Sequence, residues 1–368
     1  MRISILGAGN AGCAIAADLS SKGHEVTLIK TSHTMHEDNF SFLEQNDNRM
    51  TLDEFGVITT SRIHKISRDV TDIEEADIII IYIQTGFHRQ LIKRIAPHIQ
   101  DNQLILINPG YLSSAYVLKY CSDKDVIIAE AESSFLDGRI TNPGLFKVGF
   151  RNVRNPVGIY PNSRKQEAIT ILDNLGENIV YLESVVEAAL HNPNLIVHTV
   201  GSIMSVPRIE IAKSDFCMYH EAYSRENIAT WRILESLDSE KMSVLTKLGL
   251  EPLSYVDACK YRNSLDDNID AKEVFLEYAE MDERAKGPVK VDSRYISEDV
   301  PQGLVMLESL GKMLNTATPV TTALIELASA ALGRNLRVEG RTIERLGRES
   351  IERLLNDCER IRNEKNGF

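Results

Sequence analysis

The stretch that decides the fold reads Arg2-Ile3-Ser4-Ile5-Leu6-Gly7-Ala8-Gly9-Asn10-Ala11-Gly12, near the start of a chain of 368 residues. Its first part, Ile3 to Leu6, is an apolar run typical of a buried strand, and Ala11 to Ser21 is typical of a helix. Between them Gly7 permits a tight turn, Gly9 leaves the backbone open to a ligand, and Gly12 lets helix and strand pack closely. The stretch therefore predicts a βαβ unit.

The turn in this unit has the spacing G-x-G-x-x-G, between a strand and a helix. The N-terminus of a helix attracts anions, so the turn is suited to a phosphate group. We therefore expect it to bind the pyrophosphate of a nicotinamide cofactor through Gly7, Gly9, Asn10, Ala11 and Gly12. The alternative is an ordinary strand-to-helix loop, because glycine turns also occur by chance.

The end of the second predicted strand, Glu25 to Ile29, bears on the choice of cofactor. NAD-selective sites carry an acid roughly 20 residues after the glycines, where it binds the ribose 2′-hydroxyl. Here Lys30, Thr31 and Ser32 occupy that place, and the first acid is Glu37. A cation and two hydroxyls suit a 2′-phosphate, so we expect NADP(H) to be preferred and NAD(H) to be possible. Alternatively, Lys30 is a solvated strand end and either cofactor is used.

The first half of the chain alternates short apolar runs with amphipathic stretches, which predicts an α/β domain with a mostly parallel, doubly wound sheet of the Rossmann type. We expect helices that include Gly86 to Ile99 and Arg164 to Leu175. The predicted strands are Ile3–Leu6, Glu25–Ile29, Asp77–Ile83, Gln103–Asn108, Val126–Ala129, Lys147–Phe150, Pro156–Tyr160 and Ile179–Leu182.

The second half is predicted to be mainly α-helical, because long runs with helical periodicity begin near Ser184. These runs are 185–204, 224–248, 300–314, 320–332 and 351–365. We place the boundary near residue 183, which gives a dinucleotide-binding domain at 1–183 and a helical substrate domain at 184–368. No linker-like composition marks the boundary, so we expect the two parts to pack together along a cleft.

Composition narrows the classes of partner. The formal net charge of −12 argues against nucleic acid and against an anionic membrane surface, and we find no apolar run long enough to cross a bilayer. The five cysteines are widely spaced and form no CxxC pair, and the start of the chain shows no secretion signal. We therefore expect a cytoplasmic protein with reduced thiols and no metal requirement.

Several segments, taken in order, resemble the opine dehydrogenase family of the octopine/nopaline dehydrogenase type. They are Leu106-Ile107-Asn108-Pro109-Gly110, Asn192-Pro193-Asn194-Leu195-Ile196-Val197-His198, Ser293-Arg294-Tyr295-Ile296-Ser297-Glu298-Asp299-Val300-Pro301, Gly303-Leu304-Val305, Thr318-Pro319 and Gly340-Arg341-Thr342. The resemblance implies a dinucleotide-binding domain followed by a helical one. It also implies NAD(P)H-dependent reductive condensation of an amino acid with a 2-keto acid such as pyruvate, through an imine.

The resemblance assigns His198 as catalytic acid/base, Asp299 as its acidic partner and Arg294 as a ligand of a substrate carboxylate. A histidine suits proton transfer near neutral pH, and a carboxylate on its other ring nitrogen would fix the tautomer. Asn194 should lie one helical turn before His198 on the same face, with Pro193 in the first turn of that helix. We therefore assign Asn194 to substrate binding.

Each of these residues also has an ordinary structural explanation. His198 lies in an apolar stretch, where a lone histidine is more often a core residue. Asp299 could complement the dipole of a helix capped by Ser297. Arg294 could form a surface ion pair with Asp292 or Glu298.

Two further predictions concern binding residues. His88 follows the strand Asp77 to Ile83 and should lie at the carboxyl end of the sheet, where it could approach the nicotinamide ribose. A cluster in the helical half could line the amino-acid pocket, although core packing explains its tyrosines equally well; it comprises Tyr219, His220, Glu221, Tyr223 and Ser224.

Two other functions stay open. One is a reductase of a simple 2-keto or 2-hydroxy acid, similar to ketopantoate reductase or glycerol-3-phosphate dehydrogenase; such enzymes use a catalytic lysine, and the segment from Asn194 to His198 has none. The other is a dinucleotide sensor without chemistry. A homodimer through the helical domain is also expected to be possible.

Overall fold

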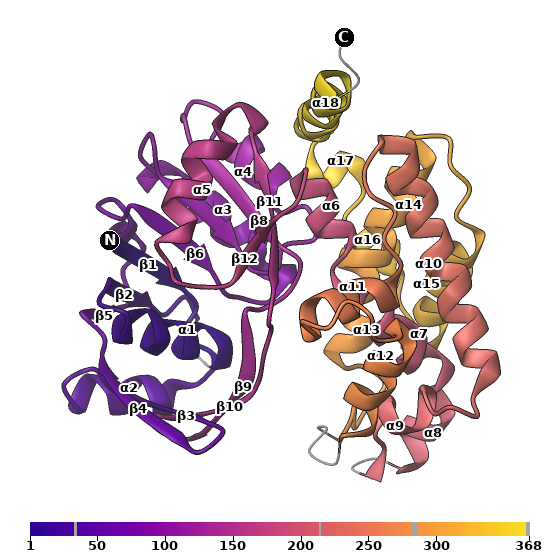
Figure 1. The fold of residues 1–368 in the computed structure, drawn as a ribbon, viewed down its shortest axis with the longest axis horizontal. Helices are drawn as coiled ribbons and strands as arrows, with labels where there is room; N and C mark the ends of the chain where they lie inside the picture. Colours follow the sequence, from indigo (N-terminus) through magenta and orange to yellow (C-terminus); the bar gives the residue numbers. More distant parts are fainter. Residues whose placement is uncertain (33–34, 213–214, 282–285, 366–368) are drawn as a thin grey trace. The chain divides into compact units, whose positions relative to one another are not determined.

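The computed structural model describes residues 1–32, 35–212, 215–281 and 286–365. The chain forms two compact units, Met1–Val185 and Val186–Phe368. Figure 1 shows the first as sheets with helices and the second as helices. The α/β class with a helical second part is therefore confirmed, and the boundary predicted near residue 183 lies close to the division.

The main sheet of the first unit has eight strands in the order β12-β11-β8-β7-β6-β1-β2-β5. All neighbours pair in parallel except β11 and β8. The strands are β1 (Arg2–Leu6), β2 (Glu25–Ile29), β5 (Lys65–Ser67), β6 (Ile78–Ile81), β7 (Leu104–Ile107), β8 (Ile127–Ala131), β11 (Asn155–Tyr160) and β12 (Ile179–Tyr181). The central strands β6 and β7 are buried at every position, which explains why their sequences are continuous apolar runs.

Five α-helices accompany these strands in the described part of the first unit: α1 (Asn10–Ser21), α2 (Glu37–Gln45), α3 (His88–Ile95), α4 (Ser114–Tyr120) and α5 (Lys165–Asp173). The helix α1, which follows the glycine turn, is rich in alanine and buries most of its length. Its small side chains allow it to pack among the strands of both sheets of this unit.

A second sheet in the first unit has the order β4-β3-β10-β9. Its strands are β3 (Arg49–Glu54), β4 (Val57–Arg62), β9 (Leu136–Asn142) and β10 (Leu145–Arg151). The predicted strand Lys147–Phe150 is part of β10 and therefore lies in this second sheet and not in the main one. Three of these strands were not predicted, because only one face of this sheet is buried and its sequences lack the long apolar runs of the main sheet.

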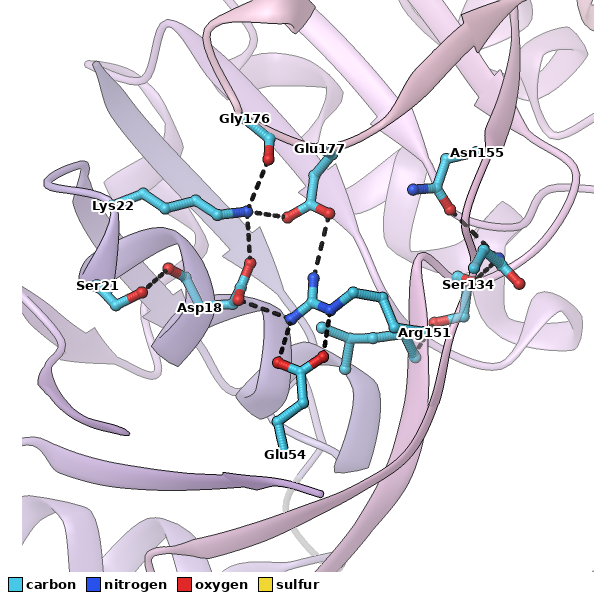
Figure 2. Close-up of polar contacts among 11 residues, drawn as sticks. Asp18, Ser21, Lys22, Glu54, Ser134, Arg151, Asn155, Gly176 and Glu177 are labelled. Carbon is cyan, nitrogen blue, oxygen red and sulfur yellow. Dashed lines mark hydrogen bonds and ion pairs between the residues drawn. The ribbon is translucent and has the colours of Figure 1, made fainter. Parts of the chain in front are cut away.

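A cluster of charged side chains ties the far end of α1 to the second sheet (Figure 2). Arg151 on β10 pairs with Glu54 on β3 at 2.6 Å and with Asp18 on α1 at 2.9 Å. Glu177 accepts hydrogen bonds from Lys22 at 2.6 Å and from Arg151 at 3.4 Å. Two cations and three carboxylates thus fix the helix whose opposite end carries the glycine turn.

The second unit consists of helices. These are α6 (Val185–Leu190), α7 (Val197–Met204), α8 (Val206–Ala212), α9 (Met218–Ala222), α10 (Ile228–Leu248), α11 (Tyr255–Asn263), α12 (Ala271–Glu280), α13 (Arg294–Ser297), α14 (Val305–Met313), α15 (Pro319–Leu332), α16 (Leu336–Glu339), α17 (Ile343–Leu346) and α18 (Arg348–Lys365).

The helical run predicted over 185–204 is broken into α6 and α7, so Pro193 does not begin the helix that carries His198. Pro193 instead begins a 3-10 turn, Pro193–Leu195, and α7 starts at Val197. The side chain of Asn192 accepts a hydrogen bond from the backbone N–H of Asn194 at 3.1 Å. That contact caps the turn and gives the chain an alternative to a continuous helix.

In the described residues no single helix is long and apolar enough to cross a membrane. One pair of helices, Pro193–Met204 and Val206–Ala212, is long and apolar enough when the two are taken together, although they are bent by 69°. This statement concerns length and composition alone.

Candidate active site

The glycine turn has the geometry that its spacing predicted. Gly7 has a φ of +121°, and a Cβ atom on it would lie 2.2 Å from the carbonyl oxygen of Tyr82. A Cβ on Gly12 would lie 1.8 Å from the carbonyl oxygen of Gly7. A Cβ on Gly9 would meet nothing closer than His36, at 3.7 Å. Gly7 and Gly12 are therefore required by the fold, whereas the space at Gly9 fits a ligand that approaches the backbone.

The first turn of α1 completes this cradle. Gly9 is its N-cap residue, and the first N–H groups of a helix have no acceptor within the helix. The side-chain oxygen of Asn10 is already used within the protein, because Oδ1 accepts a hydrogen bond from the N–H of Ile140 on β9 at 2.9 Å. Backbone donors, including those of Asn10 and Ala11, therefore remain the groups that fit a pyrophosphate.

An unsatisfied amide lies at the same edge of the sheet. Asn108 follows β7 directly, is 1% exposed, and has no hydrogen-bond partner on either side-chain atom within the described part of the chain. A buried amide without partners is costly, and a bound polar ligand would remove that cost. In the sequence, Asn108 stands in one of the segments that resemble the family, and no role was predicted for it. Its position and its unused donor and acceptor fit the nicotinamide end of a cofactor.

The residues after β2 are arranged differently from the prediction. The side chain of Lys30 is 2% exposed, and its ammonium group donates to the carbonyl oxygen of Met35. Thr31 and Ser32 follow and are half-buried. No acid follows β2 directly, but the carboxylate of Glu37 lies 3.6 Å from the Lys30 ammonium and so brings an acid to this place. Lys30 is thus not an open cation for a 2′-phosphate.

The expectation that His88 approaches the nicotinamide ribose was wrong, because its imidazole is fully buried and both ring nitrogens contact protein groups. The Nε2 atom lies 3.1 Å from the carbonyl oxygen of Ile83, which requires Nε2 to donate. The Nδ1 atom lies 2.7 Å from the hydroxyl of Ser113. His88 therefore holds the segment after β6 against the loop that precedes α4.

In the second unit the structure brings His198 and Asp299 together across 101 residues of sequence. The Nδ1 atom of His198 lies 2.9 Å from Oδ2 of Asp299, and the two side chains are 12% and 7% exposed. The ring of Tyr295 stacks on the imidazole with 3.8 Å between centroids and 11° between planes. Contacts on one edge and one face thus fix the orientation of the imidazole.

The electrostatics of this pair suit proton transfer. Burial raises the pKa of the Asp299 carboxyl above its ordinary value, although the hydrogen bond from His198 opposes the shift. A carboxylate on Nδ1 favours the tautomer in which Nδ1 carries the proton and Nε2 has a free lone pair. Within the described residues no side chain hydrogen-bonds to Nε2. The His198 side chain is 12% exposed, and Nε2 is the ring nitrogen that Asp299 does not occupy.

Backbone contacts hold both members of the pair. The hydroxyl of Tyr223 donates to the carbonyl oxygen of Val197, directly before His198. Asp299 precedes a π-helical turn, Val300–Leu304, a rare conformation that is frequent at functional sites. The buried Arg341 donates from its backbone N–H to Pro301 in that turn at 2.9 Å, and from Nε to Gln302 at 2.8 Å. The site thus rests on contacts within the helical unit.

The alternative explanation of Asp299, as an acid in the first turn of a helix capped by Ser297, was wrong. Ser297 is the last residue of α13, and its hydroxyl donates to the carbonyl oxygen of Ser293 at 2.9 Å. Arg294 begins α13, and its Nε donates to the Glu298 carboxylate at 2.6 Å, which is one of the ion pairs expected on structural grounds. Its side chain is 64% exposed, so the guanidinium remains accessible.

Asn194 is half-buried in the 3-10 turn before α7. The prediction that it shares a helix with His198 was wrong, because the chain bends at Asn192-Pro193 and the α-helix begins only at Val197.

The cluster at 219–224 is largely structural. The buried ring of Tyr223 packs edge-on against Trp231 and Phe275, and Tyr219 packs against Phe275 and Tyr278. Glu221 forms an ion pair with Arg208, and His220 Nε2 lies 3.3 Å from the carbonyl oxygen of Met281. Core packing, the alternative given for the two tyrosines, therefore accounts for Tyr223.

In the described part of the chain, no group of three His, Cys, Asp or Glu side chains is placed to hold a metal ion. The five cysteines are buried, and none of them forms a disulfide bond within the described residues.

Comparison with known proteins agrees with the division of the chain into an α/β unit and a helical unit. Residues 181–332 match the family model "NAD/NADP octopine/nopaline dehydrogenase, alpha-helical domain", and residues 3–129 match "Ketopantoate reductase PanE/ApbA". The chain is 27% identical to an opine dehydrogenase of Arthrobacter sp. (strain 1C) over 351 residues, which cover 94% of each protein.

Solved structures show the same fold. Octopine dehydrogenase with NADH and L-arginine superposes with a TM-score of 0.73 at 16% identity, over 94% of this chain and 96% of that one. Yersinopine dehydrogenase with bound NADP+ superposes with a TM-score of 0.67 at 15% identity, over 98% and 96%. The resemblance seen in the sequence is confirmed: the helical unit matches the octopine/nopaline dehydrogenase family model, and the chain is similar over nearly its whole length to an opine dehydrogenase.

Proposed function

We propose that this protein joins the amino group of an amino acid to the carbonyl carbon of a 2-keto acid such as pyruvate and reduces the resulting imine. The observation that carries the proposal is the buried pair of His198 and Asp299, with Nδ1 held at 2.9 Å and Nε2 open. Support comes from the 27% identical opine dehydrogenase and from the family model matched by the helical unit.

His198 would move the protons of this reaction. Attack of the free amine on the ketone and loss of water require protons to be taken up and released at nitrogen and oxygen, and an imidazole does both near neutral pH. Reduction then adds a hydride to the former carbonyl carbon and a proton to nitrogen. Nε2 is the nitrogen that can exchange the proton, because Nδ1 is bound to Asp299.

Asp299 and Arg294 would act beside it. Asp299 keeps the proton on Nδ1 and stabilises the imidazolium when Nε2 is protonated. Arg294 offers a planar fork for a carboxylate, which both substrates carry, and it would have to share that fork with Glu298.

The cofactor would be held by the glycine turn in the first unit, with the N–H groups at the start of α1 on its pyrophosphate and the Asn108 amide at its nicotinamide end. When bound in reduced form, it supplies the hydride. Gly9 would leave the backbone exposed to the phosphates, and Asn108 would gain the partners that it lacks.

The other candidate is reduction of a simple keto acid, and it is favoured by the match of residues 3–129 to ketopantoate reductase. That match covers the first unit, whereas the helical unit matches octopine/nopaline dehydrogenase. A requirement for an added amino acid separates the two reactions.

The test is a matrix of 2-keto acids against amino acids with the purified protein. Loss of reduced nicotinamide is followed, and each product is identified by mass. We expect turnover only when both substrates are present, with a product mass equal to their sum less one oxygen atom. Turnover with a keto acid alone would contradict condensation and support the simple reductase.

We also propose a cytoplasmic location, supported by the five buried cysteines, which form no disulfide. A homodimer through the helical unit stays a prediction, which light scattering on the purified protein would test.

A further inference from the structure

Two cations lie side by side at the carboxyl ends of β2 and β5. The strands are parallel neighbours, with Ile29 opposite Ser67, and the N–H of Lys30 donates to the carbonyl oxygen of Ser67 at 2.8 Å. Lys30 and Arg68 are therefore the first residues past the two strands. In dinucleotide-binding units the residues after the second strand of the βαβ unit meet the adenosine ribose, so both cations lie in the region that distinguishes a 2′-phosphate from a 2′-hydroxyl.

The two cations differ in access. The Lys30 side chain is 2% exposed and its ammonium is occupied by the carbonyl oxygen of Met35. The Arg68 side chain is 35% exposed, and its guanidinium lies over the ring of Phe40, 4.7 Å from the centroid. Stacking on one face leaves the edge of the guanidinium free to bind an anion. Arg68, for which no role was predicted from the sequence, is thus the cation that a ligand can reach.

A carboxylate occupies that edge. Glu37, the first residue of α2, accepts from Nη2 of Arg68 at 2.5 Å and from Nη1 at 3.2 Å. Lys30 approaches the same carboxylate at 3.6 Å, and Glu44 lies 3.6 Å from Arg68. The contacts from Arg68 hold the pKa of Glu37 below its ordinary value, so the carboxylate is charged near neutral pH. Two oxygens on one guanidinium fork are also the geometry in which arginine binds phosphate.

We propose that Glu37 and Arg68 set the choice between NAD(H) and NADP(H) by competing for one place. While Arg68 holds Glu37, the carboxylate accepts hydrogen bonds from the ribose hydroxyls of NAD(H). A 2′-phosphate binds only by taking the Arg68 fork from Glu37, which then stands beside it as a second anion. Glu37 therefore lowers the affinity for NADP(H), and Arg68 is the residue that makes this affinity possible.

This inference rests on dinucleotide binding by the first unit and not on the proposed condensation. It can therefore be tested on the ligand-free protein by calorimetry with two fragments, 2′,5′-ADP and 5′-AMP. Binding of intact NADPH and NADH, followed by fluorescence, provides the second measurement. Neither depends on turnover, so a failed condensation assay would leave the result intact.

We expect E37Q to bind 2′,5′-ADP about tenfold or more tightly, because a competing charge is removed, and to bind 5′-AMP more weakly. R68Q should bind 2′,5′-ADP about tenfold or more weakly while its affinity for 5′-AMP changes little. The matched controls are D77N and R2Q, which break an ion pair of 3.0 Å at the amino ends of β1 and β6. These controls should leave both affinities unchanged.

Three results would overturn the inference. One is an E37Q protein with unchanged affinities. Another is an R68Q protein that keeps its affinity for 2′,5′-ADP while K30M loses it. In that case Lys30, and not Arg68, would bind the 2′-phosphate. The third is a wild-type protein that binds neither fragment nor intact cofactor, which would remove the dinucleotide site itself. Thermal unfolding of each variant shows whether a loss of binding reflects a loss of fold.

Discussion

The glycine turn of the first unit and the side-chain pair of the second unit are built in different ways. The glycine turn is made of backbone over six consecutive residues, and its shape follows from where a Cβ atom cannot fit. The pair of His198 and Asp299 is made of side chains 101 residues apart, and it exists only because α7 and α13 pack together. The glycine turn is determined by consecutive residues of the sequence, whereas the side-chain pair depends on the tertiary fold. Each can be broken in a way that leaves the other intact.

The largest expected effect is on the side-chain part. H198A should lower turnover about a hundredfold or more, the range for loss of a general acid/base, while cofactor binding is retained. Initial rates and fluorescence titration with NADPH measure the two separately. The matched control is H98A, because His98 also has a carboxylate on Nδ1, Glu74 at 2.7 Å, but on an exposed surface. Near-normal turnover in H198A would contradict the role of His198.

The next effect tests whether Asp299 acts through His198. D299N keeps the shape of the side chain but removes its charge, and we expect turnover to fall about tenfold to a hundredfold, since the imidazolium loses its partner. The pH dependence of kcat should change with it, because the imidazole that transfers the proton has lost the carboxylate on its Nδ1. The control E74Q removes the carboxylate partner of His98 and should change neither. A D299N protein with an unchanged pH profile would restrict Asp299 to a structural role.

How much of each part could be predicted follows from this contrast. The turn at Gly7, Gly9 and Gly12 was predicted from spacing alone, since each glycine answers a local requirement. Asp299 was assigned to His198 only through a family resemblance, because nothing in the sequence near either residue shows their proximity. The continuous helix expected from Pro193 onward was wrong, since the Asn192 side chain caps a short turn instead.

The cofactor residues show the same limit. His88 was predicted at the correct edge of the sheet, but its ring is used by Ser113, a residue 25 positions away. Lys30 was predicted as an open cation, but the path of the chain after β2 returns Glu37 to it and covers the ammonium. No role was predicted for Arg68, because its position next to Lys30 depends on the pairing of β5 with β2. Strand order and loop paths are tertiary properties, and periodicity does not encode them.

The backbone part can be divided by two alanine substitutions. G12A places a Cβ atom 1.8 Å from the Gly7 carbonyl oxygen, so α1 must shift, and we expect a loss of about 1–3 kcal/mol in the free energy of unfolding. G9A meets nothing within 3.7 Å, so the fold should persist while affinity for the cofactor falls about tenfold. Urea unfolding and fluorescence titration separate the two effects. If G9A bound the cofactor normally, the pyrophosphate would have to lie elsewhere.

The smallest effect concerns the ionic cluster that holds the far end of α1. Burial and the neighbouring Asp18 raise the pKa of Glu177 to about 7, above the 4.5 of an ordinary glutamate. The folded protein therefore holds this proton more tightly than the unfolded chain does. The stability that comes from the protonated carboxyl is present below pH 4.5 and is lost as the pH rises to about 7. Asp18 has a lowered pKa and titrates below this window.

E177Q carries a permanently neutral side chain, so its stability relative to the wild type should increase as the pH rises from about 5 to about 8, by of order 1 kcal/mol or more. Urea unfolding at several pH values measures the difference. The control E167Q removes an exposed carboxylate whose pKa is lowered by Arg164, so its difference from the wild type should stay constant over that range. A constant difference for E177Q as well would mean that Lys22 and Arg151 keep Glu177 ionised. The cluster would then hold α1 with equal strength at every pH in that range. The stability of the helix that carries the glycine turn would not depend on protonation of Glu177.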